Sequence, residues 1–422
     1  MPPREPLDTP DPPRHAARHA GARTIFYIVR DPLPPTRADL LTLFGDELPR
    51  HGIRTELIGQ GAAGVDRWEG GAMHVAGRPG RLAALLSPFW DALGLLRAAR
   101  GVRPDCIQVR DKIGSALVAR LAAALWRVPF VVWMSFPIVE GYAVRRDDLR
   151  RHGMRLAWLA HALRAIAARV ALYRFVLPGA HHVFVQSAAM AASLAARGVP
   201  SERMTAVPMG VDPARFVRAT IAPSHDTRLD RRRVLLYLGR VARSRQSGFL
   251  LDVVERLRPG LPELLLVIAG DAPSPDEMAW MRAEIARRAL QNHVLLTGWL
   301  PRHTALGYAV RAEVGLSPIP RGTLFDVSSP TKLVEYLALG IPSVANDIPD
   351  QARVIADSGA GLCVPMEADA FAAAVRQLLD DKVLAAACSQ RGPAYVKRHR
   401  AYAILGRLVA ETYTKILPER IA

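Results

Sequence analysis

The residues best placed to do chemistry lie close together, between Ser329 and Glu335. Pro330 suits the first position of a helix, and the Ser329 hydroxyl can accept hydrogen bonds from the free backbone N–H groups that follow. Such a helix start attracts anions, and Lys332 adds a positive charge there. Glu335 follows Thr331 by one helical turn, so both lie on one face. This spacing favours a nucleotide, with phosphate at the helix start and ribose hydroxyls near the carboxylate; a capped surface helix is the alternative.

A second group of candidate residues follows a predicted strand. Gly239 would let the backbone turn close to a ligand, and Arg240 and Arg245 supply guanidinium groups in the same loop. A guanidinium can pair with two phosphate oxygens at once, so arginine is well suited to a diphosphate. Gly270 and Gly298 also follow predicted strands, although each of them alone is a common structural feature.

Length and charge narrow the class of protein. The chain has 422 residues, enough for two domains of roughly 150–200 residues. Half of the residues are hydrophobic, and the formal net charge is +17. This charge favours acidic partners: nucleotide phosphates, anionic lipid head groups or nucleic acid. Nucleic acid is disfavoured, because the sequence has no zinc-ligand spacing and no aromatic residues interleaved with Lys or Arg.

Cysteines and apolar segments indicate the compartment. Cys106, Cys363 and Cys388 are few, odd in number and far apart, so we expect no disulfide framework and a reducing cytoplasm. Residues 1–22 are rich in Pro, Arg and His and predict a disordered tail without a signal peptide. We expect no spanning helix of ~20 uninterrupted apolar residues, since two arginines and a proline break the best candidate, 115–134.

Short apolar strands alternate with helical segments along most of the chain. The predicted strands are residues 24–29, 55–58, 105–109, 129–134, 182–185, 234–238, 264–269, 293–296, 314–317, 342–345 and 361–364. This alternation is typical of parallel sheets with helices on both faces. Two such series predict an α/β protein of two doubly wound, Rossmann-like domains that bind ligands at the carboxyl ends of their strands, facing a cleft.

The segment 151–180 has a different character. From Met154 to Phe175 it is apolar on one side, rich in arginine and almost free of acids. This pattern predicts an amphipathic helix. It is typical of helices that lie on an anionic membrane surface, and also of an insertion packed on a domain with an arginine-lined solvent face.

These motifs together resemble the retaining glycosyltransferases of family 4, which have the GT-B architecture. Residues 207–212 are similar to the family's Pro-Asn-Gly-Val-Asp element, with Met209 in the place of Asn. Gly239, Arg240 and Arg245 match its Gly-Arg-x-x-x-x-Lys loop, with Arg for Lys. Residues 329–344 match its Ser-Pro-x-Lys-x-x-Glu core. The resemblance covers most of residues 23–418.

The resemblance implies functional roles for individual residues and a division of the chain into domains. Arg240 and Arg245 would hold the donor diphosphate, and Glu335 would bind the ribose hydroxyls. Further donor-binding positions are Gly239, Ser329, Pro330, Thr331 and Lys332. The implied parts are a tail (1–22), an N-terminal acceptor-side domain (23–215), a C-terminal nucleotide-sugar-binding domain (216–395) and a helical segment that crosses back to the first domain (396–422).

The sequence departs from the family pattern at several positions. Val327 stands where the family has a second acid, with Asp326 beside it as a substitute. Residues 31–36 replace the family's Gly-Gly turn, and residues 135–142 replace a turn that contains histidine. Within that turn, Glu140 is our candidate for an acceptor-side group, and a solvated loop glutamate is the alternative.

We therefore expect a cytoplasmic, peripherally membrane-associated enzyme. It would move a sugar from a nucleotide donor to a lipid-linked or polysaccharide acceptor, with retention of configuration as the resemblance implies. No metal or other cofactor is expected, because no Asp-x-Asp motif follows a strand and cationic side chains can stabilise the leaving diphosphate. Two alternatives remain: a nucleotide-sugar epimerase of the same architecture, or a non-catalytic sugar-nucleotide-binding module in a polysaccharide assembly complex.

Overall fold

The computed structural model describes residues 22–61, 67–77, 80, 86–151 and 153–417. The predicted tail, 1–22, lies outside these residues except for its last position. The three cysteines are free thiols, as predicted.

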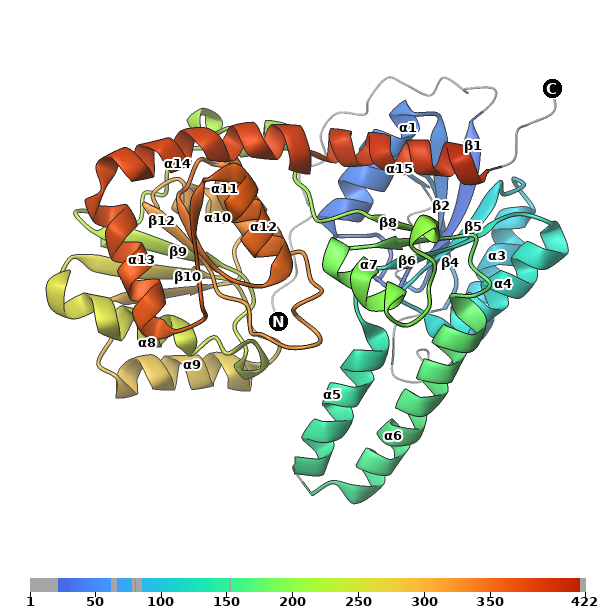
Figure 1. The fold of residues 1–422 in the computed structure, drawn as a ribbon, viewed down its shortest axis with the longest axis horizontal. Coiled ribbons are helices and arrows are strands. Elements are labelled where there is room, and N and C mark those ends of the chain that lie inside the picture. Colours follow the sequence, from blue (N-terminus) through green and yellow to red (C-terminus); the bar gives the residue numbers. More distant parts are fainter. Residues whose placement is uncertain (1–21, 62–66, 78–79, 81–85, 152, 418–422) are drawn as a thin grey trace.

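The N-terminal half is built on an eight-stranded sheet with the strand order β3-β4-β2-β1-β5-β6-β7-β8 (Figure 1). Its strands are β1 (Arg23–Ile28), β2 (Ile53–Gly59), β3 (Arg67–Trp68), β4 (Gly71–Val75), β5 (Cys106–Arg110), β6 (Phe130–Met134), β7 (His182–Val185) and β8 (Met204–Ala206). Neighbouring strands pair in parallel, except for the short β3, which is antiparallel to β4.

Helices cover both faces of this sheet. The helical elements of this half include the π-helical segments η1 (Asp39–Glu47) and η2 (Ala171–Val176) and the helices α1 (Leu48–Arg50), α3 (Ser87–Ala99), α4 (Ile113–Trp126), α5 (Ile138–Arg151), α6 (Arg155–Val170) and α7 (Ala188–Ala195). Strand β1 shows why both faces need cover: Phe26 and Ile28 belong to one buried cluster, and Ile25 and Tyr27 to another. Alternate side chains of a strand point to opposite faces, so an apolar run requires a layer on each side.

The C-terminal half contains a six-stranded, fully parallel sheet with the order β11-β10-β9-β12-β13-β14. Its strands are β9 (Arg233–Leu238), β10 (Leu264–Ala269), β11 (Val294–Gly298), β12 (Val314–Ser317), β13 (Ser343–Asn346) and β14 (Gly361–Val364). Its helices are α8 (Phe249–Leu257), α9 (Pro275–Arg287), α10 (Arg302–Ala309), α11 (Thr331–Ala338), α12 (Pro349–Ser358), α13 (Ala368–Asp380) and α14 (Lys382–Tyr395). Two such halves confirm the predicted α/β fold class.

The chain passes between the halves twice, and the two passages lie side by side. The first is the linker after β8, and the second is the segment η9 (Val396–Arg400) that leads into α15 (Tyr402–Ile416). Val211 of the linker forms a parallel bridge with Ala401. Helix α15 packs on the N-terminal half, where the Tyr413 hydroxyl donates a hydrogen bond to Gln108 at 2.5 Å (Figure 1).

The basic amphipathic segment is one arm of a helical hairpin. Helices α5 and α6 pack against each other and extend away from the N-terminal sheet (Figure 1). By length and composition, the described stretch Arg155–Val176 is long and apolar enough to cross a membrane, and little of it is buried. The expectation of no such segment needs correction, because the arginines interrupt the apolar sequence without ending the helix.

Candidate active site

The loops at the carboxyl ends of the two sheets meet. Ser187, directly after β7, donates a hydrogen bond from its hydroxyl to the backbone oxygen of Val327 at 2.6 Å. Val327 lies in the loop after β12 and packs against the N-terminal core. The family's second acid is therefore replaced here by an apolar contact between the halves. The Asp326 carboxylate, the substitute considered for that acid, forms an ion pair with Arg321 at 2.8 Å.

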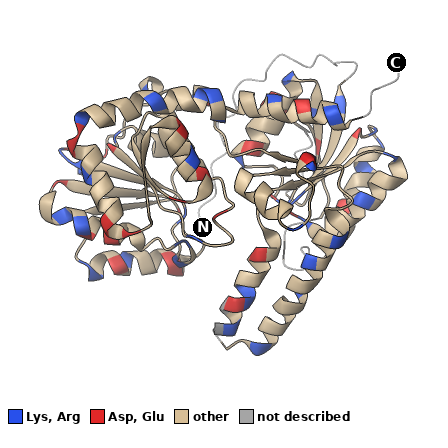
Figure 2. Ribbon diagram, in the orientation of Figure 1, with Lys and Arg blue, Asp and Glu red and all other residues tan. Residues whose placement is uncertain are grey.

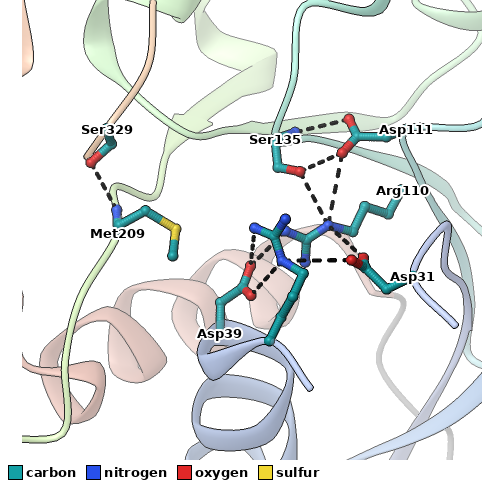
Figure 3. A network of polar contacts seen from close by, with 8 residues as sticks. Asp31, Asp39, Arg110, Asp111, Ser135, Met209 and Ser329 are labelled. Carbon is teal, nitrogen blue, oxygen red and sulfur yellow. Dashed lines mark hydrogen bonds and ion pairs between the residues drawn. The ribbon is translucent and has the colours of Figure 1, made fainter. Parts of the chain in front are cut away.

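Helix α11 begins one residue later than predicted. Pro330 is the N-cap, and no side chain caps the helix. The predicted cap by Ser329 is wrong, because the Ser329 hydroxyl has other partners. It donates to Asp350 at 2.7 Å, and it accepts from the backbone N–H of Met209 at 3.0 Å (Figure 3). The first backbone N–H groups of α11 thus have no side-chain acceptor from Ser329, and the loop before them is tied to the linker.

A buried ion pair holds this loop in place. Arg400, at the end of η9, donates to Asp350 at 2.7 Å and also to the Ser329 hydroxyl at 3.3 Å. Asp350 lies in the first turn of α12. The ion pair therefore joins the C-terminal crossing segment, the C-terminal half and the loop before α11.

Lys332 lies beside the glycine turn that follows β9. Its side chain is buried, and its Nζ atom lies 4.5 Å from the centre of the Tyr237 ring. Burial lowers the pKa of Lys332. Gly239 has φ +155°, and a Cβ atom there would lie 3.3 Å from Cε of Lys332. A Cβ on Gly270 would lie 2.0 Å from the Gly239 oxygen, so this corner admits no larger residue at position 270.

Arg240 and Arg245 present charges that no described carboxylate neutralises by an ion pair. Arg240 is exposed and Arg245 is half-buried at the end of η7 (Arg243–Arg245). Arg243 differs, because it forms an ion pair with Glu277 at 3.5 Å and stacks on Trp280. The Arg245 charge also disfavours protonation of Lys332, which places the two cations in the same electrostatic environment.

Glu335 lies one turn into α11 and is half-buried. Burial raises the pKa of its carboxyl group, while the positive charges of Arg302 and Lys332 oppose the rise. Its carboxylate accepts no hydrogen bond from the described residues, so its oxygens can accept hydrogen bonds from a ligand. The structure thus brings Gly239, Arg245, Lys332 and Glu335 together at the carboxyl end of β9 and the start of α11.

Glu140 does not join this group. It lies in α5, where its carboxylate forms an ion pair with Arg197 at 3.0 Å. This ion pair joins α5 to the turn after α7, and Glu140 is not among the residues that line the cavity on this side of the molecule.

That cavity has a volume of about 860 Å³ and lies between the N-terminal strand ends and the foot of the α5–α6 hairpin. Asp111, Lys112, Phe136 and Tyr142 line it, together with Leu324 from the C-terminal half. It therefore faces the loop that leads to α11. A second cavity, of about 660 Å³, lies beside α14 and the linker, away from the strand ends.

A buried polar network at the same edge of the N-terminal sheet was not found from the sequence. Arg110, the last residue of β5, is fully buried and donates to Asp39 at 2.6 Å and to Ser135 at 3.2 Å (Figure 3). Asp31 and Asp111 lie 3.9 and 3.8 Å from its Nε atom. The signal in the sequence was an Arg-Asp pair directly after a predicted strand.

The network shifts the pKa values of its two buried carboxyl groups, Asp39 and Asp111, in opposite directions. Burial would raise the pKa of Asp39, but the positive charges of Arg110 and Arg37 outweigh it and lower the pKa to about 2. Burial raises the pKa of Asp111, whose carboxylate accepts a hydrogen bond from the backbone N–H of Ser135 at 3.0 Å. Among the described residues, no group of three or more potential metal-ligating side chains is found.

The arrangement of two doubly wound sheets with facing carboxyl ends defines the GT-B class of proteins. Two family models match the chain: one described as a glycosyl transferase 4-like domain matches residues 9–210, and one described as glycosyl transferases group 1 matches residues 232–381. The chain belongs to the GT-B glycosyltransferases of the family 4 type.

Individual relatives agree with this assignment. A phosphatidyl-myo-inositol mannosyltransferase from Mycolicibacterium smegmatis is 30% identical over 195 residues, 46% of this chain and 47% of the relative. A GDP-mannose-dependent alpha-(1-6)-phosphatidylinositol monomannoside mannosyltransferase from the same organism is 27% identical over 267 residues, 61% of this chain and 66% of the relative. The chain thus spans about half to two thirds of the length of these curated relatives.

A solved structure shows the same fold. The Anabaena protein HepE in complex with UDP and glucose has a TM-score of 0.66 and 17% sequence identity, and the match covers 92% of this chain and 99% of that chain.

We predict that Asp39→Asn lowers the free energy of unfolding by about 3 kcal/mol at pH 7, because it leaves the buried Arg110 charge poorly compensated. The folded-state pKa of Asp39 lies below its ordinary value of 3.8, so its stabilisation is present above pH 4 and is lost as the pH falls toward 2. The difference in the free energy of unfolding between the wild type and the variant should therefore become smaller as the pH falls from 4 toward 2. Urea unfolding at several pH values measures this difference.

The matched control is Asp369→Asn, which removes the exposed ion pair with Arg256 and should change stability by less than about 1 kcal/mol. Equal effects of the two substitutions would contradict the role assigned to the Arg110 network.

Proposed function

We propose that this protein transfers a sugar from a nucleotide-diphosphate donor to an acceptor hydroxyl, with retention of configuration. The observation that supports this best is the placement of Arg245, Lys332 and the start of α11 around the Gly239 turn, with Glu335 one turn behind. Cations and free N–H groups can hold a diphosphate, and an unpaired carboxylate can accept the two ribose hydroxyls.

The proposed mechanism depends on stabilisation of the leaving group. As the bond between the sugar carbon and the diphosphate oxygen breaks, negative charge grows on the diphosphate. Fixed positive groups aimed at that charge lower the barrier, and Arg240, Arg245 and Lys332 would supply them without a metal ion. The acceptor oxygen then forms the new glycosidic bond and gives its proton to an oxygen of the departing diphosphate.

We further propose that the acceptor is lipid-linked, with a polysaccharide acceptor as the alternative. The two relatives from Mycolicibacterium are named for phosphatidylinositol-based substrates, and one of them for GDP-mannose; HepE was solved with UDP. GDP and UDP are therefore the first donor nucleotides to test. A thermal-shift screen with UDP, GDP, ADP and CDP should give one clearly preferred nucleotide, and no stabilisation by any of them would contradict the proposal.

The surface of α6 supports a peripheral place at the inner face of a membrane. Leu156, Leu163 and Ile166 are 87%, 60% and 61% exposed. The helix carries basic and no acidic residues (Figure 2). Apolar insertion and attraction to anionic lipid act together in helices of this type.

Val327 motivates a second candidate function, a non-catalytic module that binds sugar nucleotides. An apolar residue in the place of the second acid leaves one carboxylate fewer near the donor sugar. Release of free or transferred sugar from a panel of nucleotide sugars separates the two functions, because a binding module would show affinity without turnover.

We predict that Arg240→Ala and Arg245→Ala each weaken binding of the preferred nucleoside diphosphate by about 1.5–3 kcal/mol, the range for a hydrogen bond to a charged group. Isothermal titration calorimetry measures this change. Arg243→Ala is the control from the same loop, since Arg243 is already paired with Glu277. The affinity of this variant for the nucleoside diphosphate should stay close to that of the wild type. Unchanged affinity in both Arg240→Ala and Arg245→Ala would contradict the proposal that these arginines bind the donor diphosphate.

We predict that Glu335→Gln weakens binding of a ribonucleoside diphosphate more than binding of its 2′,3′-dideoxy analogue. A carboxylate can accept from both ribose hydroxyls, whereas an amide retains a single acceptor oxygen. The experiment measures the affinity of each ligand for the wild type and for the variant. An equal loss of affinity for the two ligands would mean that Glu335 does not bind the ribose hydroxyls and serves only the structure of the helix.

We predict that the protein binds anionic vesicles more tightly than neutral ones and that this binding weakens as salt rises, because salt screens the attraction. Replacing Arg155, Arg169 and Arg174 with Gln should reduce the binding by roughly 1 kcal/mol for each well-placed arginine. Co-sedimentation with liposomes measures it.

The matched control replaces three exposed arginines of the C-terminal region with Gln: Arg282, Arg353 and Arg398. If both triple variants bind vesicles equally well, or if the wild type shows no preference for anionic lipid at low salt, the hairpin is not a membrane-binding element.

A further inference from the structure

The cavity of about 660 Å³, here called the hinge cavity, lies at the amino ends of β12 and β13. The proposed donor site lies at the carboxyl ends of the same sheet, so the two are on opposite sides of the C-terminal half. The linker contributes Phe216 and Arg218 to the wall of the cavity, and η9 contributes Val396 and Lys397. Both passages of the chain between the halves therefore line this cavity, whose volume is in the range of small-molecule sites, ~300–1,000 Å³.

The wall that α14 forms is long and carries small or apolar side chains. Ala385, Ala386, Ser389 and Pro393 line the cavity from this helix, and residues four apart share one helix face. The helix also contributes Lys382, and the stretch from Lys382 to Pro393 covers about 17 Å at 1.5 Å per residue. A ligand that fills the cavity is therefore elongated and mostly apolar.

The wall that faces α14 is apolar as well. Leu339, at the end of α11, and Leu378, in α13, are buried, and both line the cavity. Val217 of the linker also lines it and is 44% exposed. Val217 thus keeps apolar surface in contact with water that no described residue covers, and covering such surface with an apolar chain is favourable.

The lining has an excess of positive charge. Lys382 lies 3.7 Å from Glu313, the one carboxylate among the described lining residues. Arg218 and Lys397 line the cavity too, and neither forms an ion pair with a described carboxylate. Arg218 donates a hydrogen bond to the backbone oxygen of Val310 at 2.6 Å, which uses only part of the five donors of a guanidinium group. The cavity therefore favours an anionic ligand.

We propose that the hinge cavity binds a single-chain amphiphile with an anionic head group, of the fatty-acid class, and that the bound ligand ties the linker to α14. The alkyl chain would lie between α14 and the linker, and the lining cations would hold the head group. A rotation of one half against the other flexes both passages of the chain, so a ligand held between them restrains that rotation. This site goes beyond the proposed function, because it lies away from the donor site.

Shape and charge together distinguish this ligand from simpler ones. A short anion such as acetate leaves the apolar walls uncovered. A cationic amphiphile covers those walls, but it meets Arg218, Lys382 and Lys397, which repel it. An anionic amphiphile uses both features of the cavity.

The test uses the full chain and three probes below their micelle concentrations. Decanoate is the anionic amphiphile, decyltrimethylammonium has the same chain with a cationic head group, and acetate has the head group without the chain. By titration calorimetry, the wild type should bind decanoate, and it should bind each of the other two at least about tenfold more weakly. Hydrogen–deuterium exchange locates the site: with decanoate, the amides of residues 213–218 and 385–397 should exchange more slowly.

Three variants probe the walls and the charge. Ala386→Phe places a ring in the cavity and should weaken decanoate binding about tenfold; Ala386 is exposed, so the fold should tolerate the change. Lys382→Gln and Lys397→Gln should each weaken it about threefold, the effect of a partly exposed charge. The matched controls are Ala373→Phe on α13 and Lys415→Gln on α15, since both residues are exposed and neither lines the cavity.

Equal affinities for decanoate and decyltrimethylammonium would overturn the inference, as would equal effects of Ala386→Phe and Ala373→Phe on decanoate binding. Slower exchange at α6, with no change at residues 213–218, would place the ligand on the hairpin surface and also overturn it. If a second copy of this chain fills the cavity instead, sedimentation will show a dimer that Ala386→Phe dissociates, and that result would overturn it too. If Ala386→Phe fails to fold, the two lysine variants, compared with Lys415→Gln, decide the outcome.

Discussion

The ion pair between Arg400 and Asp350 is the interaction on which the arrangement of the two halves depends. Both side chains are buried, and the pair joins the returning C-terminal segment to the start of α12. Through the Ser329 hydroxyl it also fixes the loop before α11 and the linker at Met209. A buried charge that loses its partner is strongly destabilising, so the pair holds in one geometry the loop that leads into the proposed donor site.

Much of the fold was predictable, because it follows from local patterns. Apolar runs such as Ile25–Val29 must be strands covered on both faces, and their alternation with helices gives a doubly wound sheet. The short strands β3, β4 and β8 and the α5–α6 hairpin were missed. Their stability comes from pairing and packing with distant segments, which a periodic pattern does not reveal.

The parts of the candidate site that depend on local backbone features were predictable from the sequence. Gly239 and Lys332 follow from a glycine turn and a helix start, and the structure places the Lys332 side chain beside the Gly239 turn. The Ser329 cap was wrong because Asp350 and Met209, far away in the sequence, compete for its hydroxyl. The Arg110 network was missed for the same reason, since Asp39 lies 71 residues from its partner. Val327, where the family pattern has an acid, packs against the N-terminal core, a contact that the sequence departure alone did not reveal.

The most direct test of the central claim is a crystal structure of the protein with its preferred nucleoside diphosphate. The account predicts the diphosphate at the start of α11, with its oxygens about 3 Å from the nitrogen atoms of Arg240, Arg245 and Lys332, and with the ribose hydroxyls at Glu335. A nucleotide bound elsewhere, with these four side chains free of it, would contradict the account.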